Sequence, residues 1–389
     1  MRGLARLAKR VMAIAESETL LINARSAQLK AQGIDVVNFA AGEPDFDTPQ
    51  HIKEAAKKAI DEGFTKYTAA SGTPELKKAI CEKLKRDQGL DYGLENIIVS
   101  CGAKHSLFNA FMTLCDKDDE VIIPVPYWVT YPELVKLANS TPVFLKTREE
   151  NGFKIDPHDL KKLVSRKTKV LIVNSPSNPT GSAYRLDELK EIAKIAFANG
   201  VYVISDEIYE KVIYDGMRHE SIAPFDKDQT ILVNGVSKSY AMTGWRIGYV
   251  AGPSSVVAAM NRLQSQSTSN PTSISQKAAL AALNGGDECL GPMVKAFKER
   301  RDYIVDRLNA MPKIHTRKPE GAFYVFPNIS KYGIQSARLS QMLMEEAHVA
   351  VVPGAPFGSD EHIRLSYATS MENIKKGLDR IGEFLKKLS

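Results

Sequence analysis

Short apolar runs rich in β-branched residues alternate with helix-like stretches from about residue 95 onward. Continuous apolar runs of this length are typical of strands buried on both faces, and their alternation with helices indicates a mostly parallel sheet. We therefore expect an α/β fold with a three-layer large domain around a seven-stranded sheet. The expected strands are 97–100, 120–124, 170–173, 201–205, 231–233 and 246–253. The expected helices include 103–115, 185–199 and 254–264.

The two ends of the chain have a different pattern. Residues near 8–32 are expected to be helical, and residues 287–311 to form one long charged helix. We assign both ends to a smaller α+β domain, made of 1–47 with an N-terminal arm and 291–389, beside a large domain at 48–290. The remaining elements expected at the C-terminal end are strands 321–326, 349–352 and 363–366 and a closing helix 371–388.

Charge and cysteine content exclude several classes of protein. The 52 basic and 46 acidic residues leave a net charge of +6, and the basic residues are interspersed with acids, which argues against a nucleic-acid partner. The four cysteines lack metal-type spacing, so we expect free thiols, no metal and a cytoplasmic location. No apolar run approaches the ~18 residues of a membrane span. The basic segment 1–10 is expected to be a docked arm rather than a targeting signal.

Polar and small residues follow the expected strands where each one ends. In an open α/β sheet, ligands bind outside the carboxyl ends of the strands. Common nucleotide motifs do not explain this set, because neither Gly-x-Gly-x-x-Gly nor Gly-x4-Gly-Lys-Ser/Thr occurs at the first sheet strand. The segments that converge are Cys101-Gly-Ala-Lys104, Val125-Pro-Tyr-Trp128, Asn174-Ser-Pro-Ser-Asn178, Asp206-Glu-Ile-Tyr209 and Asn234-Gly-Val-Ser-Lys238.

A pyridine aldehyde phosphate accounts for these residue types together. Its aldehyde needs a lysine for a Schiff base, and its ring nitrogen needs a carboxylate that keeps it protonated. Its ring oxygen needs donors, and its ring face needs an aromatic partner. Its phosphate needs the N–H groups of a helix start and a cation. The sequence therefore predicts pyridoxal 5′-phosphate as cofactor.

Five sequence blocks identify the family that the chain resembles. Together they resemble the class I and II aminotransferases, which are fold type I pyridoxal-phosphate enzymes, over essentially the whole chain. Within that family the chain is most similar to the bacterial aspartate/prephenate group, so the resemblance implies an aspartate aminotransferase-like fold. The blocks are Ala40-Ala-Gly-Glu-Pro-Asp-Phe-Asp-Thr-Pro49, Ser175-Pro-Ser-Asn-Pro-Thr-Gly181, Ser205-Asp-Glu-Ile-Tyr209, Ser237-Lys-Ser-Tyr-Ala-Met-Thr-Gly-Trp-Arg246 and Arg364-Leu-Ser-Tyr-Ala-Thr369.

The resemblance implies roles around the cofactor ring. Lys238 is expected to hold the cofactor as a Schiff base and to move the proton of the substrate Cα, and Asp206 to pair with the pyridine nitrogen. Tyr209 and Asn178 are expected to donate to the ring oxygen, and Trp128 to stack on the ring. Four of them have a structural alternative: Lys238 a surface lysine, Asp206 a helix cap, Asn178 a turn starter and Trp128 a core residue.

The same resemblance implies a phosphate site at a helix start. The N–H groups of Gly102, Ala103 and Lys104 are expected to hold the phosphate. The Ser237 hydroxyl and the Arg246 guanidinium are expected to complete the site. An ordinary salt bridge is the alternative role for Arg246.

Substrate contacts are implied by residues outside the sheet. Arg364 is expected to clamp the α-carboxylate beside the Gly42 backbone, with Asn178 and Trp128 also near the substrate. Lys104 and Thr19 resemble the residues that bind a distal carboxylate in the bacterial group, and 264–270 holds no obvious arginine for that role.

The family resemblance also implies a shared site. Tyr67 resembles the tyrosine that reaches the phosphate of the neighbouring subunit, which implies a homodimer.

These residues predict an aminotransferase that moves an amino group between an amino acid and a 2-oxo acid. Aspartate and glutamate are the expected donors, with prephenate and arogenate as a further pair. Alternatives are an aromatic or other specificity, or a lyase or synthase on the same fold. A non-enzymatic regulator is the remote alternative, because we find no DNA-binding segment before residue 40.

Overall fold

The large sheet in this computed structural model, which describes residues 7–388, has seven strands in the order β2-β8-β7-β6-β5-β3-β4. All are parallel except β8, which runs antiparallel to both of its neighbours. The expected mostly parallel seven-stranded sheet is thus confirmed. The strands are β2 Ile97–Ser100, β3 Glu120–Val125, β4 Thr141–Lys146, β5 Thr168–Asn174, β6 Tyr202–Asp206, β7 Thr230–Gly235 and β8 Gly248–Ala251.

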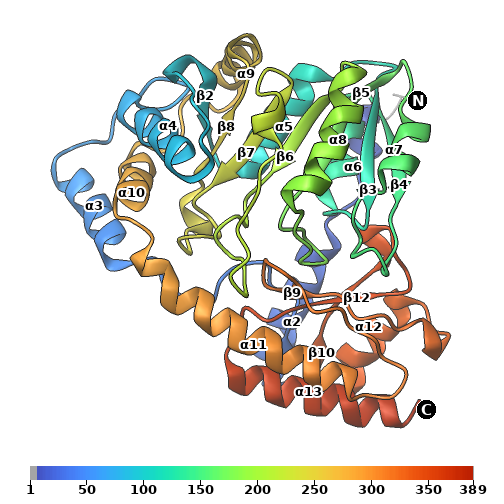
Figure 1. The fold of residues 1–389 in the computed structure, drawn as a ribbon. Helices are drawn as coiled ribbons and strands as arrows, with labels where there is room; N and C mark the ends of the chain where they lie inside the picture. Colours follow the sequence, from blue (N-terminus) through green and yellow to red (C-terminus); the bar gives the residue numbers. More distant parts are fainter. Residues whose placement is uncertain (1–6, 389) are drawn as a thin grey trace, which may run out of the picture.

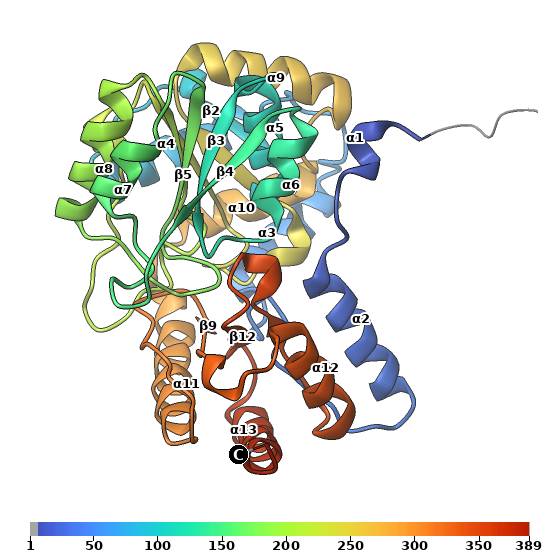
Figure 2. The same ribbon diagram turned by 90° about the vertical axis from the view of Figure 1, so that its right-hand side faces the viewer.

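Helices cover both faces of this sheet (Figures 1 and 2). Successive strand residues point to opposite faces, so Ile97 and Ile98 of β2 enter different hydrophobic clusters. One face packs on α5 Ala103–Leu114, α6 Thr130–Leu137 and α9 Ser254–Ser267. The other packs on α4 Pro74–Gln88, α7 Pro157–Leu163, α8 Leu186–Ala198 and α10 Ser273–Asn284, with α3 Gln50–Asp61 against α10.

Residues 18–38 and residues 291–386 lie together below the large sheet in Figure 1, whereas α1 Lys9–Met12 lies against α6. β1 Val37–Asn38 pairs in parallel with β10 Val349–Ala350, which joins segments about 310 residues apart. A three-stranded antiparallel sheet has the order β11-β12-β9. Its strands and the surrounding helices are β9 Tyr324–Val325, β11 Val352–Pro353, β12 Ile363–Ser366, α2 Glu18–Ala31, α11 Gly291–Asn309, α12 Ser336–Glu346 and α13 Met371–Lys386. The domain boundaries at 47/48 and 290/291 stay a prediction.

Several elements differ from the expectation. The helical segment near 8–32 is two helices, α1 Lys9–Met12 and α2, because the chain between them docks through the Ala15 N–H on Glu133 of α6 at 3.0 Å. The helix expected from 287 begins at Gly291, with Pro292 in its first turn. Strand 321–326 shortens to β9. The elements missed from the sequence are β1, β4, α3, α4, α6, α7, α10 and α12.

Short 3₁₀ helices connect several of these elements. Residues 1–6 of the basic N-terminal segment lie outside the described range. None of the helices between residues 7 and 388 is long and apolar enough to cross a membrane. The 3₁₀ helices are Leu94–Asn96, Ala223–Phe225, Thr243–Trp245, Glu288–Leu290, Ser330–Tyr332 and Ala355–Phe357.

Two glycines of α13 offer a matched test of packing between the chain ends. A Cβ on Gly377 would collide with the buried Phe39 ring and lie 2.9 Å from Val37 Cγ1, whereas a Cβ on Gly382 meets only Met311 Cε at 3.6 Å. We expect Gly377→Ala to lower the free energy of unfolding by about 1–3 kcal/mol, since overpacking outweighs the gain in helix propensity. Gly382→Ala should leave it unchanged or raise it by up to about 1 kcal/mol. Urea titration measures both, and equal effects would contradict the close α13–β1 contact.

Candidate active site

A cavity of about 440 Å³ opens at the carboxyl ends of the sheet strands, between them and the chain ends. This is the edge at which an open α/β sheet collects its ligands. Gly102 and Asp206 adjoin cavity-lining residues, and Tyr67 lies elsewhere on the surface. The candidate residues that line it are Thr19, Gly42, Ala103, Lys104, Trp128, Asn178, Tyr209, Ser237, Lys238, Arg246 and Arg364.

The Lys238 amine projects into this cavity from the turn after β7. Its Nζ donates to the Gly42 carbonyl oxygen at 2.6 Å. Burial lowers the pKa of Lys238 to about 8, while the Glu43 carboxylate opposes that shift and the Arg246 guanidinium adds to it. An amine with this pKa is more often neutral near pH 7 than an ordinary lysine, as nucleophilic attack on an aldehyde requires.

The Asp206 carboxyl is the last side chain of β6 and lies buried beneath the cavity. It accepts from the Tyr131 hydroxyl at 2.7 Å and from the Ile208 N–H at 3.3 Å, and no helix follows it directly. Burial raises its pKa from 3.8 to about 6, against the lowering effect of the Tyr131 hydrogen bond. A buried carboxylate with so few donors favours a further N–H partner, which a pyridine nitrogen can supply when protonated.

The Arg364 guanidinium is buried on β12 and held by two acceptors. Nη1 donates to Asn178 Oδ1 at 3.0 Å, and Nη2 donates to the Ala40 carbonyl oxygen at 2.9 Å. Its Nε is buried without a hydrogen-bond partner among residues 7–388. A buried N–H left unpaired is costly, so the arginine retains donor capacity for an anion that enters the cavity.

The start of α5 has the shape of an anion cradle. Gly102 precedes the helix at φ 91°, and no side chain caps the first turn. A Cβ on Gly102 would collide with Arg246 Nη2, and a Cβ on Gly248 with the Ala103 nitrogen, so backbone and guanidinium approach closely. Arg246 donates to backbone carbonyl oxygens, of Thr243 at 2.9 Å and of Cys101, rather than to a carboxylate. First-turn N–H groups beside a guanidinium fit a phosphate.

Trp128 and Lys104 meet on the other side of the cavity. The Lys104 Nζ lies 5.0 Å from the centre of the Trp128 ring, within the range of a cation–π contact. Burial and the nearby Arg246 guanidinium lower the pKa of Lys104. Trp128 and Tyr131 make a T-shaped contact with ring centres 5.4 Å apart, and both line the cavity.

Sequence reasoning missed two tyrosines of the site. Tyr131 holds Asp206, and the Tyr324 hydroxyl lies 2.9 Å from the Tyr209 hydroxyl. The Tyr324 ring lies 4.5 Å from Arg364 Cζ. Spacing could have pointed to Tyr131, because it lies three residues after Trp128 where a helix begins. Tyr324 gives no comparable signal, since its position depends on the pairing of β9 with β12.

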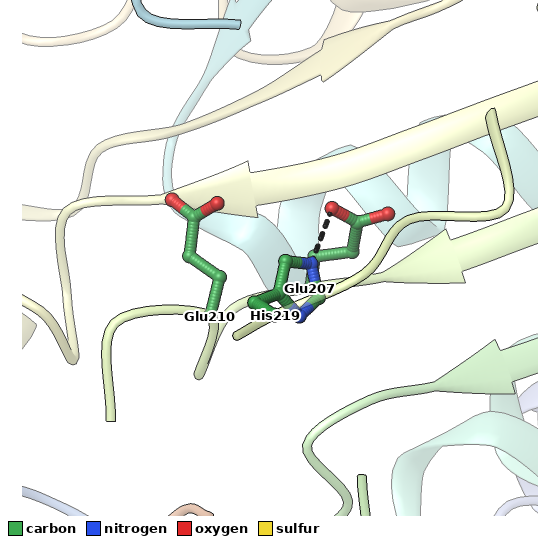
Figure 3. Close-up of side chains that lie close together, drawn as sticks. All are labelled: Glu207, Glu210 and His219. Atoms are coloured by element: carbon green, nitrogen blue, oxygen red, sulfur yellow. Dashed lines mark hydrogen bonds and ion pairs between the residues drawn. The ribbon is translucent and has the colours of Figure 1, made fainter. Parts of the chain in front are cut away.

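Three titratable side chains that do not line the cavity, Glu207, Glu210 and His219, lie close together (Figure 3). Glu207 pairs with His219 Nε2 at 2.9 Å and accepts from two serine hydroxyls, and Glu210 pairs with the buried Lys83 ammonium. These partners lower the pKa of Glu207 despite its burial. Lys83 already supplies positive charge, so we interpret the cluster as a structural ion network.

The raised pKa of Asp206 predicts a pH-dependent cost in the cofactor-free protein. Between pH 3.8 and about 6 the folded state binds a proton that the unfolded state has lost, so stability falls as pH rises through that window. Above it the full cost is about 3 kcal/mol. We expect cofactor-free Asp206→Asn to match the wild type near pH 4 and to exceed it by up to that amount at pH 7. Urea unfolding across pH measures the difference, and a pH-independent difference would refute a raised pKa.

Comparisons with known proteins agree with this geometry. The family model for aminotransferase class I and II matches residues 34–381. Aspartate aminotransferase of Geobacillus stearothermophilus is 50% identical, over 98% of this chain and 99% of that protein. Aspartate/prephenate aminotransferase of Nitrosomonas europaea is 46% identical, over 98% and 100%. Aspartate aminotransferase of Thermus thermophilus with maleate superposes with a TM-score of 0.95 at 43% identity, over 98% and 100%. The chain belongs to the class I and II aminotransferases.

Proposed function

We propose that the protein transfers the amino group of aspartate or glutamate to a 2-oxo acid with pyridoxal 5′-phosphate as cofactor. The observation that carries the proposal is the convergence of Lys238, Asp206 and Arg364 on one cavity. An amine of lowered pKa, a buried carboxyl and an arginine with an unpaired N–H are the groups that this reaction requires. The named relatives support aspartate as the donor.

The cofactor site draws on groups described above. Lys238 would anchor the cofactor, Asp206 would pair with its ring nitrogen, and Tyr209 and Asn178 would donate to its ring oxygen. The start of α5, with Ser237 and Arg246, would hold its phosphate, and Trp128 would cover its ring. When bound, the cofactor supplies an electron sink that lets the Cα–H bond of an amino acid break. Lys238 Nζ is the group placed to accept that proton and return it.

The α-carboxylate of the substrate is proposed to bind Arg364. Asn178 and the Ala40 carbonyl hold the two Nη atoms, which orients the planar guanidinium. A carboxylate would pair with the remaining Nε–H and share the Nη donors. The Gly42 backbone, already in contact with Lys238, would line the approach.

The distal carboxylate of aspartate is proposed to bind between Lys104 and Thr19. Lys104 is a partly buried cation whose described contact is the Trp128 ring rather than an acid. Thr19 lies in the first turn of α2, and Ser17 before it makes no capping hydrogen bond. First-turn N–H groups and the helix dipole favour an anion there. Prephenate also carries a second carboxylate, so the same contacts support it as an acceptor.

The sites are proposed to be shared in a homodimer. The Tyr67 ring is 90% exposed and does not line the cavity of its own chain. Tyrosine is enriched at protein interfaces, which supports a partner subunit at this exposed position. Tyr67 of one subunit would then reach the phosphate held by the other.

The organisation and location of the protein are part of the same proposal. We divide the chain into a cofactor-binding large domain, 48–290, and a small domain from 1–47 and 291–389. Four free cysteines support a reducing compartment, the cytoplasm.

Two complementary variants test the function and the shared site. The wild type with pyridoxal 5′-phosphate should convert aspartate and 2-oxoglutarate into oxaloacetate and glutamate. Lys238→Ala should be inactive, because no other amine in the described cavity lies at the Gly42 backbone. Tyr67→Ala should be impaired through weaker phosphate binding. When the two variants are mixed and allowed to exchange subunits, the activity of the mixture should exceed that of either variant alone. The reason is that half the sites of a mixed dimer hold both intact residues.

The exposed Lys190 provides the control for the lysine variant. Lys190→Ala should keep wild-type turnover. Full activity of Lys238→Ala would refute the anchor, and confirmed subunit exchange without a gain would refute the cross-subunit Tyr67.

Lys104→Ala is expected to change specificity. It should lower kcat/KM for aspartate, glutamate and prephenate. The loss should correspond to about 1.5–3 kcal/mol of transition-state stabilisation, the range for a hydrogen bond to a charged group. Phenylalanine should lose much less, since it has no second carboxylate. Steady-state kinetics on the four substrates measure this. Parallel losses for aspartate and phenylalanine, together with weaker cofactor binding, would assign Lys104 to the phosphate alone.

A further inference from the structure

A chain of side-chain amides joins α2 to the arginine pocket. Asn23 Nδ2 donates to the Thr19 carbonyl oxygen at 2.8 Å, one turn earlier on α2. Asn38 Nδ2 of β1 donates to Asn23 Oδ1 at 2.8 Å. The Ala40 N–H donates to Asn38 Oδ1 at 2.8 Å, and the Ala40 carbonyl accepts from Arg364 at 2.9 Å. The two ends of the cavity are thus connected by successive hydrogen bonds.

The direction of this chain is determined by its ends. The Ala40 N–H can only donate and the Thr19 carbonyl can only accept. Asn38 must therefore present its oxygen to Ala40 and its NH₂ to Asn23. Asn23 must in turn present its oxygen to Asn38 and its NH₂ to Thr19. Turning over either amide breaks two of these bonds, so the arrangement has a single favourable state.

The first half of α2 makes few apolar contacts among residues 7–388 apart from those of Ile22. Its two fully buried residues, Ser26 and Leu29, lie in its second half. In the first half Leu20 is 66% exposed and Leu21 is 47% exposed, while Ile22 is partly buried. Apolar packing therefore constrains this end weakly, and the Asn23–Asn38 bond is the polar contact that ties it to β1.

We propose that Asn23 and Asn38 are positioning residues that couple the Thr19 end of the cavity to the Arg364 end. The inference rests on the proposed function, in which a dicarboxylate substrate spans both ends. Holding α2 and Ala40 at a fixed separation sets the distance between the two proposed carboxylate sites. A substrate with a single carboxylate does not depend on that distance.

Asn38→Asp removes the hydrogen bond that Asn38 donates to Asn23 and keeps the one that it accepts from the Ala40 N–H. The new carboxylate still accepts from the Ala40 N–H but cannot donate to Asn23 Oδ1. If Asn23 turns over to donate to the new carboxylate, the contact between α2 and β1 is restored at the cost of the Thr19 carbonyl. Asn23→Ala, which removes that contact and keeps Asn38 on the Ala40 N–H, is therefore made in parallel and should give the same losses. Asn199→Ala is the matched control, because Asn199 Nδ2 donates to the Ile195 carbonyl four residues earlier at 2.8 Å, at the end of α8.

The holoenzyme is compared by three measurements: kcat/KM for aspartate and for alanine, maleate affinity, and melting temperature. Asn38→Asp should lower kcat/KM for aspartate and maleate affinity by about tenfold, the size of a lost hydrogen bond network. The kcat/KM for alanine should fall by less than about threefold. The melting temperature should stay within the range of the Asn199→Ala control. Equal losses for aspartate and alanine, or a lowered melting temperature with unchanged maleate affinity, would assign the amides a structural role only.

A double-mutant cycle with Thr19→Val makes the coupling explicit. In the wild type, Thr19→Val should lower maleate affinity, and in Asn38→Asp the same change should have a much smaller effect. Independent, additive losses in a protein that uses aspartate would overturn the coupling alone. A wild type that does not transaminate aspartate would overturn the proposed function instead, and the coupling with it.

Discussion

The parallel pairing of β1 with β10 is the contact on which the rest of the site depends. The Val37 N–H donates to the His348 carbonyl at 2.9 Å, and Phe39 donates to Ala350 at 2.8 Å. Phe39 then accepts from the Ser366 N–H at 2.8 Å, which places the N-terminal segment beside β12. Without this pairing, Ala40 and Gly42 would not reach the arginine and lysine of the cavity. Backbone hydrogen bonds between distant segments thus hold the small-sheet residues over the carboxyl ends of the strands of the large sheet.

Electrostatics of the cavity follow from the same closure. The sheet alone would leave its carboxyl edge in water, where Lys238 and Asp206 would have ordinary pKa values. The chain ends remove that water, so burial becomes the largest influence on both side chains and on Arg364. The Lys238 ammonium and the Arg364 guanidinium then repel each other, while the Asp206 carboxyl lies beneath the cavity. An anionic substrate offsets the repulsion between the two cations.

The sequence predicted the parts of the fold that local pattern determines. Apolar runs marked six of the sheet strands, but β4 was missed because its Thr-Pro start and exposed Phe144 are those of an edge strand. Lys238 and Asp206 could be identified because Asp206 ends an apolar run and Lys238 lies in the short turn after one. Tyr324 could not, since its position depends on the pairing of β9 with β12. The Asn23–Asn38 bond could not either, since β1 is positioned by pairing with β10 about 310 residues away.

The weak packing at the start of α2 has a consequence for how substrate range can change over evolutionary time. The start of α5 is packed so closely that a Cβ on Gly102 would collide with the Arg246 guanidinium and one on Gly248 with the Ala103 backbone. Thr19 and Leu20, by contrast, are carried on a half-helix that contributes little to the core. Substitutions there alter the cavity at small cost in folding free energy. Under the proposed binding of a second carboxylate at Thr19, selection can therefore change substrate choice on this helix while the groups around Lys238 and Asp206 stay unchanged.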